Sequence, residues 1–227
     1  MNLHDHHCYK KNSPIITHFI DIVLGSEYKN NTDSSIKKWN KHTNLIVKLT
    51  GEYTENDEND ITDIIKEISQ LTKLNIKISK QNTDNVNIIV FFGTADDYKN
   101  NYDPNIKKEP TAKAFFTFKA NNKGDIKNAT IFINKKLSGI ERTDIIKEEM
   151  TQIMGLTNDS RTEKNSIFYQ YKYTDKKYYN TEYSTLDKEI IKLLYMDYVQ
   201  TGWKYAQVIR YLTYCDKVLN DYNIISK

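Results

Sequence analysis

The stretch of sequence that decides the fold is EEMTQIMGLTNDS, residues 148–160. Glu148 and Gln152 are four positions apart, so in a helix they lie on one face about one turn apart. Gly155 is expected to end this helix, because glycine adopts the left-handed conformation of a helix cap at little cost. The bend at Gly155 would bring Asn158 back towards the other two side chains. These residues predict a polar site at the C-terminal end of a helix.

The spacing resembles the motif H-E-x-x-H-x-x-G-x-x-H of the metzincins, in which three histidines bind zinc and the glutamate is the general base. Here the three ligand positions hold Glu148, Gln152 and Asn158, and the position of the base holds Glu149. Taken alone, the motif is more typical of a solvated helix face followed by a glycine cap, since Glu and Gln are common helix residues. The resemblance implies a retained scaffold without the zinc ligands.

Two later segments strengthen the resemblance. Ser166, Ile167, Phe168 and Tyr169 follow the third ligand position, where matrixin-like metzincins carry a turn beneath the metal. Residues 183–195 are similar to the helix that closes those catalytic domains. The sequence resembles even more closely a bacterial family of domains of unknown function, number twenty-nine twenty-seven, which is placed among the zincins. This resemblance covers nearly the whole chain and implies a zincin-like fold in an exported or lipoprotein-like, envelope-associated protein.

The donor atoms at this site argue against zinc. Catalytic zinc typically has three protein ligands, most often histidines with a carboxylate. All five histidines precede the motif; they are His4, His6, His7, His18 and His42. We therefore expect no cofactor, although the oxygen atoms of Glu148, Gln152, Asn158 and Asp159 would suit Ca²⁺ or Mg²⁺ better than zinc. The favoured alternative is a metal-free network in which these amides and carboxylates form hydrogen bonds with one another.

Composition narrows the class of protein. A chain of 227 residues suits one domain, or one domain with two subdomains. The net charge is +3 and the lysines are scattered among acidic residues, so no basic stripe indicates nucleic-acid binding. No segment approaches the roughly 18 consecutive apolar residues of a membrane span, so no transmembrane segment is expected. The polar first residues lack a signal-peptide layout, which indicates a cytoplasmic protein or one whose leader has been removed.

The two cysteines, Cys8 and Cys215, lie near the two ends of the sequence. They could form a disulfide if the protein is exported, which would join the N-terminal tail to the last helix. Two independent free thiols are the alternative, and the sequence leaves both open.

The order of the expected elements predicts an α/β (α+β) fold. Helices are expected at 15–24, 61–74, 94–102, from Thr143 to the motif, and at 184–195 and 203–219, with strands at 45–49, 75–80, 86–92, 114–118 and 129–133. These elements suit a twisted mixed sheet with a backing helix and an active-site helix, followed by a mainly helical C-terminal subdomain. The predicted divisions are a flexible tail at 1–13, an N-terminal subdomain at 14–160 and a helical subdomain at 161–227.

The segment 114–118 would be the edge strand on which zincin peptidases lay an extended substrate, with an ordinary hairpin strand as the alternative. The sequence thus predicts a degenerate, non-catalytic pseudo-peptidase domain that binds a peptide or protein in the former active-site cleft. The alternative is an unconventional metallohydrolase that uses Glu149 as general base with a metal site free of histidine. A purely structural role in an envelope assembly is compatible with both.

Overall fold

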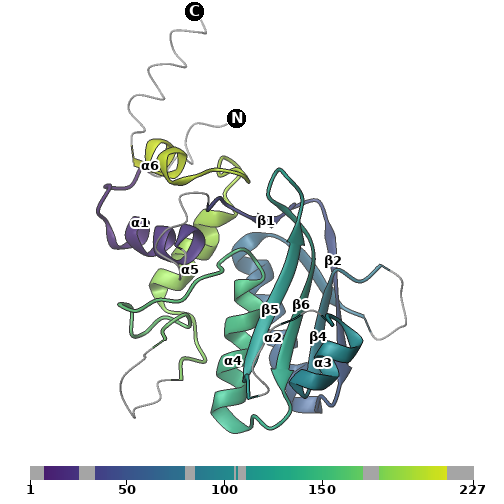
Figure 1. The fold of residues 1–227 in the computed structure, drawn as a ribbon. Coiled ribbons are helices and arrows are strands. Elements are labelled where there is room, and N and C mark those ends of the chain that lie inside the picture. The colour runs from purple at the N-terminus through teal and green to yellow at the C-terminus, as the bar shows by residue number, and fades with distance from the viewer. Residues whose placement is uncertain are drawn as a thin grey trace, which may run out of the picture.

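The computed structural model describes residues 8–25, 34–79, 85–104, 106, 111–170 and 179–213. Its strands are β1 (Lys38–Trp39), β2 (Asn44–Gly51), β3 (Asn75–Ile78), β4 (Ile88–Gly93), β5 (Ala114–Ala120) and β6 (Asp125–Asn134). They form one six-stranded sheet in the order β1-β6-β4-β2-β3, with β5 paired to β6 (Figure 1). Strand β5 is antiparallel to β6 and all other pairs are parallel. The predicted α/β class and mixed sheet are confirmed.

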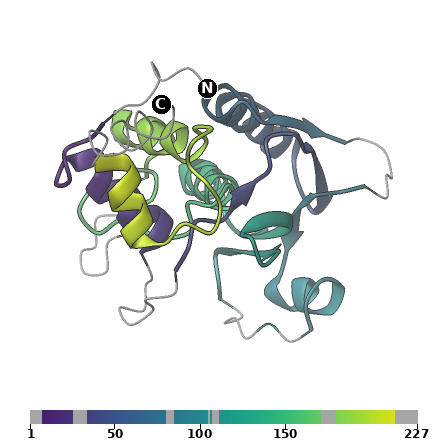
Figure 2. The same cartoon turned by 90° about the horizontal axis from the view of Figure 1, so that it is seen from above.

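Helices cover both faces of the sheet. The helices α2 (Glu55–Thr72) and α4 (Gly139–Gln152) pack together on one face, and α3 (Ala95–Asn101) lies on the other (Figure 2). The N-terminus of α2 is closed by a capping box between Thr54 and Asp57, and α3 begins in the same way at Thr94. Both caps satisfy amide groups that a helix start leaves unpaired. The start expected for α3 at residue 94 is therefore confirmed.

The central helix begins earlier than expected. The prediction that this helix starts at Thr143, with Thr143 as its N-cap, is wrong, because α4 starts at Gly139 and Ser138 is the cap residue. An additional first turn is held against α2 by Arg142, whose Nε and Nη2 donate to the two carboxylate oxygens of Asp57 at 2.5 and 2.9 Å. Thr143 instead donates its hydroxyl to Asp60 Oδ2 on α2, at 2.8 Å.

The remaining helices gather at one side of the sheet (Figures 1 and 2). They are α1 (Pro14–Phe19), the π-helical η2 (Ile20–Leu24), α5 (Thr185–Leu194) and α6 (Tyr205–Thr213). The helix expected from residue 184 is present as α5, and a capping box between Ser184 and Asp187 closes its N-terminus. Helix α1 packs against α5, although it precedes the sheet in the sequence. The predicted division of the chain into two subdomains at residue 160 stays a prediction.

The N-terminal segment lies beside the last described helix. The Tyr9 amide donates to the Leu212 carbonyl at 3.0 Å. Cys8 is disulfide-bonded, whereas Cys215 lies outside the described residues, as do His4, His6 and His7. Among the described residues, no helix combines the length and apolar character needed to cross a lipid bilayer.

Candidate functional site

The turn after α4 requires glycine at residue 155. Gly155 has φ +104°, and a Cβ atom there would lie 1.9 Å from the Lys37 carbonyl oxygen. Two buried side chains fix this turn: Trp39 Nε1 donates to the Ile153 carbonyl at 2.9 Å, and the Tyr195 hydroxyl donates to the Met154 carbonyl at 2.8 Å. The turn expected at Gly155 is thus held between β1 and the end of α5.

The last turn of α4 carries three residues of the predicted site. Glu149 and Gln152 are 8% and 5% exposed, and Glu148 is partly buried. Gln152 Nε2 donates to Asp159 Oδ1 at 3.1 Å. This amide–carboxylate bond joins the end of the helix to the chain beyond Gly155. The expected kind of bond is present, and its acceptor is Asp159.

Asn158, the third ligand position, faces a different part of the molecule. Its backbone N–H and Nδ2 both donate to the Ile22 carbonyl, at 3.1 and 2.9 Å, and Nδ2 also donates to Thr157 Oγ1 at 3.2 Å. Asn158 therefore connects the turn to η2 and does not form the expected bond with Glu148 or Gln152. The sequence could not predict this contact, because nothing in the motif shows that the N-terminal helix packs beside it.

Several carboxyl groups meet around Glu148. Its Oε1 atom is buried and has no hydrogen-bond partner among the described residues. Burial raises the pKa of Glu148 well above its ordinary value, and the charges of Glu149, Asp159 and Asp144 raise it further, while a hydrogen bond with Gln170 partly offsets them. Glu148 therefore keeps its proton at pH values where an exposed glutamate has lost it.

Asp144 lies one turn before Glu148 on α4 and extends the acidic cluster. Burial raises the pKa of Asp144 to about 6, against the opposing effect of a hydrogen bond from the Asn180 amide at 2.7 Å. The Asn180 side chain donates to the carbonyls of Lys164 and Ser166, at 3.0 and 2.8 Å. Sequence reasoning missed both residues. The four-residue spacing could have identified Asp144, whereas Asn180 carries no local signal.

The predicted turn at Ser166, Ile167, Phe168 and Tyr169 is fixed to α5 through Asp187. Ser166 Oγ donates to Asp187 Oδ1 at 2.6 Å, and the Ile167 amide donates to Asp187 Oδ2 at 3.1 Å. The same turn pairs with the chain after Asp159, since the Ser160 amide donates to the Phe168 carbonyl at 2.7 Å. The two segments of the resemblance that follow the motif are therefore in direct contact.

Asp187 also contacts the N-terminal helix. It is fully buried, and its Oδ1 lies 3.3 Å from His18 Nε2 of α1. Burial alone would raise the pKa of Asp187, but hydrogen bonds from His18, Ser166 and Ser184 outweigh it and lower that pKa. An ionised, fully bonded carboxylate here joins three segments that are far apart in the sequence.

The donor atoms of the motif do not fit zinc. The Gln152 amide nitrogen is engaged with Asp159, Asn158 faces Ile22, and His18 is bonded to Asp187. No group of three or more His, Cys, Asp or Glu side chains within the described ranges could hold a metal ion. The arrangement is a buried cluster of carboxyl and amide groups that includes Glu149, and the role of general base for Glu149 stays a prediction.

Strand β5 pairs only with β6 among the described residues, so within this part of the chain it leaves one edge of the sheet open beside α4. The Asn134 amide donates to the Lys113 carbonyl at 2.8 Å, next to the pair Ala114–Ile133. Because bonded and non-bonded pairs alternate in an antiparallel ladder, the backbone groups of Ala114, Phe116 and Phe118 face away from β6. The rings of Phe116 and Phe118 are stacked, 6.0 Å apart at 12°, and are partly buried against the core that includes α4. This edge thus offers backbone hydrogen-bonding groups beside two aromatic rings.

Fold and site together define a mixed α/β domain with an antiparallel edge strand and a buried acid–amide cluster at the end of its central helix. The sequence model of the family described as "Protein of unknown function (DUF2927)" matches residues 12–214, so the chain belongs to this family. No curated protein matches the chain.

Proposed function

We propose that this chain is a zincin-like pseudo-peptidase domain that binds an extended peptide segment without cleaving it. The observation that carries the proposal is the open edge of β5, where Ala114, Phe116 and Phe118 present backbone groups and two partly exposed rings. A peptide that adds a strand to such an edge gains main-chain hydrogen bonds, and alternate side chains of the peptide meet the aromatic rings.

The arrangement around β5 supports a zincin-like relationship. The antiparallel edge strand lies beside α4, α4 ends at the glycine turn, and the turn at 166–169 is bonded to α5 through Asp187. These are the features that the sequence resemblance implies for such a domain, in the expected order along the chain.

The surroundings of Glu149 support binding rather than hydrolysis. Glu149 is only 8% exposed and lies beside Glu148, whose pKa its charge helps to raise. A general base must come within hydrogen-bond reach of the proton that it removes. The donor atoms here also do not suit a zinc ion that would activate a water molecule. Two cavities open elsewhere on the described surface, and neither is lined by Glu148, Glu149 or Gln152.

An exported or envelope-associated location belongs to the same proposal. The disulfide bond of Cys8 supports it, because such bonds persist mainly in oxidising compartments.

The test uses a peptide selected from a random-peptide phage library on the full chain. Two versions of that peptide are N-methylated on alternate residues, one on the odd and one on the even positions. Strand addition uses the N–H groups of only one parity, so one version should lose at least tenfold in affinity and the other should bind nearly as the parent does. Equal effects of both versions would refute strand addition.

Two protein variants locate the peptide. Replacing Phe116 and Phe118 by alanine should weaken binding, whereas Tyr53→Ala, which removes an exposed ring on a different part of the surface, should not. Mass spectrometry of the peptide after prolonged incubation should show no cleavage. Cleavage that disappears in Glu149→Gln would instead favour the hydrolase alternative.

A further inference from the structure

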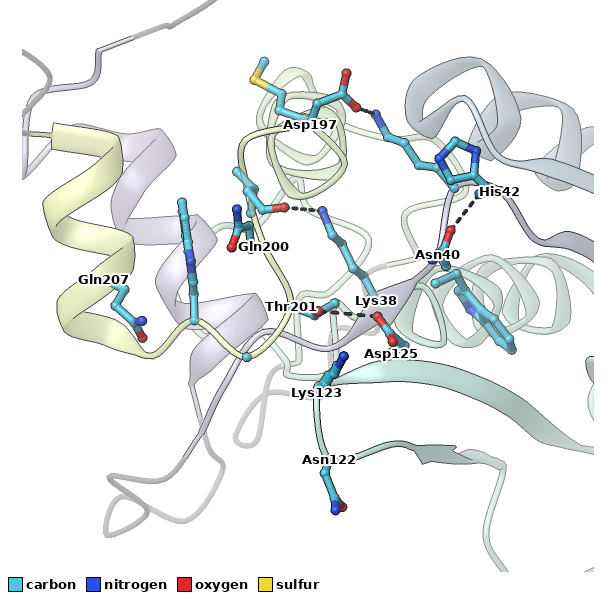
Figure 3. A pocket seen from close by; sticks show the side chains of 16 residues that line it. Lys38, Asn40, His42, Asn122, Lys123, Asp125, Asp197, Gln200, Thr201 and Gln207 are labelled. Atoms are coloured by element: carbon cyan, nitrogen blue, oxygen red, sulfur yellow. Dashed lines mark hydrogen bonds and ion pairs between the residues drawn. The ribbon is translucent and has the colours of Figure 1, made fainter. Parts of the chain in front are cut away.

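A second candidate site lies at the far end of the β5–β6 hairpin. A cavity of about 680 Å³ opens between β1, the tip of this hairpin, the loop at 196–203 and the start of α6 (Figure 3). This volume is within the range of small-molecule sites, roughly 300–1,000 Å³. None of the residues of the motif lines it, so the cavity is independent of the peptide-binding proposal.

The base of the cavity contains a buried ammonium group. Lys38 is 9% exposed and donates to the carbonyls of Leu194 and Val199 at 2.9 and 2.6 Å. Among the described residues it forms no ion pair with a carboxylate, and its ammonium has a third hydrogen to donate. Burial lowers the pKa of Lys38 to about 8, and the charge of Lys41 contributes to the decrease. A ligand that brought negative charge would compensate this cation.

The acidic residues that line the cavity already have partners. Asp197 is 2.5 Å from the Lys41 ammonium. Asp125 accepts from Asn121 Nδ2 at 2.8 Å and lies 3.8 Å from Lys127 Nζ. The charge of Asp197 acts on Lys38 and partly offsets the decrease in its pKa, but neither carboxylate forms an ion pair with Lys38 among the described residues.

Lys123 supplies a second cation without a counter-charge. It lies at the tip of the hairpin, and Figure 3 shows it on a different wall from Lys38, which extends from β1 towards the 196–203 loop. Its ammonium has no ion pair or hydrogen bond with the described residues. The amides of Asn122 and Gln200 line the same cavity and likewise have no partner within the described ranges.

The lining favours one kind of anion. No arginine contributes to the cavity, so the planar, two-pronged recognition typical of carboxylates is absent from its described lining. Lysine ammonium groups act as point charges, and two of them on separate walls suit the diverging oxygens of a tetrahedral group.

We propose that this cavity binds a small polar molecule through a phosphoryl group. Lys38 and Lys123 bind the phosphoryl oxygens, and Asn122 and Gln200 form hydrogen bonds with the polar remainder of the ligand.

The two tryptophans of the chain provide the measurement, because Trp39 and Trp203 both line the cavity. Titration of the full chain with glucose 6-phosphate, at constant ionic strength, should change their fluorescence saturably, and inorganic phosphate should compete. Glucose should produce no change. Glucuronate, which carries a carboxylate instead, should bind at least tenfold more weakly.

Lys123→Ala should weaken binding by about tenfold, and Lys123→Glu should weaken it by more than tenfold. Both variants should fold, because the hairpin tip is exposed. Lys77→Ala, at an exposed position of strand β3, should bind as the parent does. Lys38→Met should abolish binding, and circular dichroism shows whether that variant is folded. Unchanged affinity in Lys123→Glu, or glucose or glucuronate binding as tightly as the phosphate ester, would overturn the proposal.

Discussion

At Gly155, a single hydrogen atom in place of a side chain decides whether the turn after α4 can form. Gly155 and Gly139 both have positive φ angles, +104° and +59°, but only Gly155 lies against another backbone, whereas no atom lies within 4 Å of a Cβ at Gly139. Gly155→Ala should therefore lower the free energy of unfolding by roughly 2–5 kcal/mol, from backbone strain together with the clash at Lys37. Gly139→Ala should lower it by about 1–2 kcal/mol. Urea denaturation of both variants measures the difference, and equal losses would contradict this account.

Gln152 joins α4 to Asp159, and both its burial and its bond are lost when it is shortened. Gln152→Ala should lower the free energy of unfolding by about 1–3 kcal/mol, because the hydrogen bond to Asp159 is lost and a space opens in a buried position. Glu149→Ala should lower it less, because removing one acid relieves repulsion with Glu148. Chemical denaturation at neutral pH compares the two variants. A neutral Gln152→Ala would show that the bond is dispensable.

Glu148 should make stability depend on pH. In the unfolded chain its carboxyl group ionises near its ordinary pKa of 4.5, whereas the folded state keeps the proton to higher pH. The folded state therefore binds more protons above about pH 4.5, and its stability falls as the pH rises through this window. Glu148→Gln should remove that part of the decrease, so the variant gains on the parent as the pH is raised.

Asp144→Asn is the matched comparison for this pH dependence. The pKa of Asp144 is raised from 3.8 to about 6, so the gain of Asp144→Asn over the parent should develop between these values and then level off. Denaturation curves from pH 4 to pH 8 give both profiles. A Glu148→Gln profile parallel to that of the parent would contradict the assignment of a raised pKa.

At the scale of elements, local chemistry predicted two of the three helix starts that carry a capping box. The third was wrong, because α2 begins at Glu55 and not at the expected residue 61, although Thr54 and Asp57 form such a box. Thr94 with Asp97 and Ser184 with Asp187 are short-range signals, and both mark helix starts in the structure. The start of α4 was missed, because its first turn depends on Arg142 reaching Asp57 on α2. The parallel pairing of β4 with β6 likewise depends on partners that lie far apart in the sequence.

Asp187 joins α5 to α1 and to the turn at 166–169, so its loss should affect all three elements. Asp187→Asn keeps the size of the side chain but removes the charge that His18 and Ser166 face. We expect a loss of about 3–5 kcal/mol, the range found when one partner of a buried charged network is removed. Asp197→Asn, at a side chain that is 83% exposed, should cost at most about 1 kcal/mol. Thermal and urea unfolding compare the two, and similar losses would contradict a linking role for Asp187.

At the scale of the whole molecule, the sequence predicted which side chains lie together on α4 better than it predicted their partners. The helix spacing placed Glu148, Glu149 and Gln152 on the last turns of α4, and Gly155 at its end. The motif could not show that Asn158 would face Ile22 or that Asp144 would join the acids, since both depend on how distant helices pack. The cavity at Lys38 has no sequence signal, because its walls come from three separate regions of the chain.

The packing of α1 against α5 predicts that the N-terminal helix is part of the folded unit. Ile16, Phe19 and His18 are buried, and His18 contacts Asp187. Deleting residues 1–33 should therefore abolish cooperative unfolding or lower the melting temperature by more than 10 °C. For comparison, a loss of about 2 kcal/mol in the free energy of unfolding lowers the melting temperature of a chain of this size by less than 10 °C. Deleting residues 1–7 leaves this contact intact and should leave the melting curve nearly unchanged. A stable truncation at residue 33 would show that the sheet folds without α1.

We expect the open edge of β5 to give the protein an affinity for itself as well. Two copies can place their β5 strands side by side and continue one sheet into the next, since the edge contains no proline and Lys119 is its one charged residue. Any peptide that binds here must then displace a neighbouring copy, so its apparent affinity falls as the protein concentration rises. The fraction of β5 edges that bind a peptide, and not a second copy, would therefore depend on the concentration of the protein.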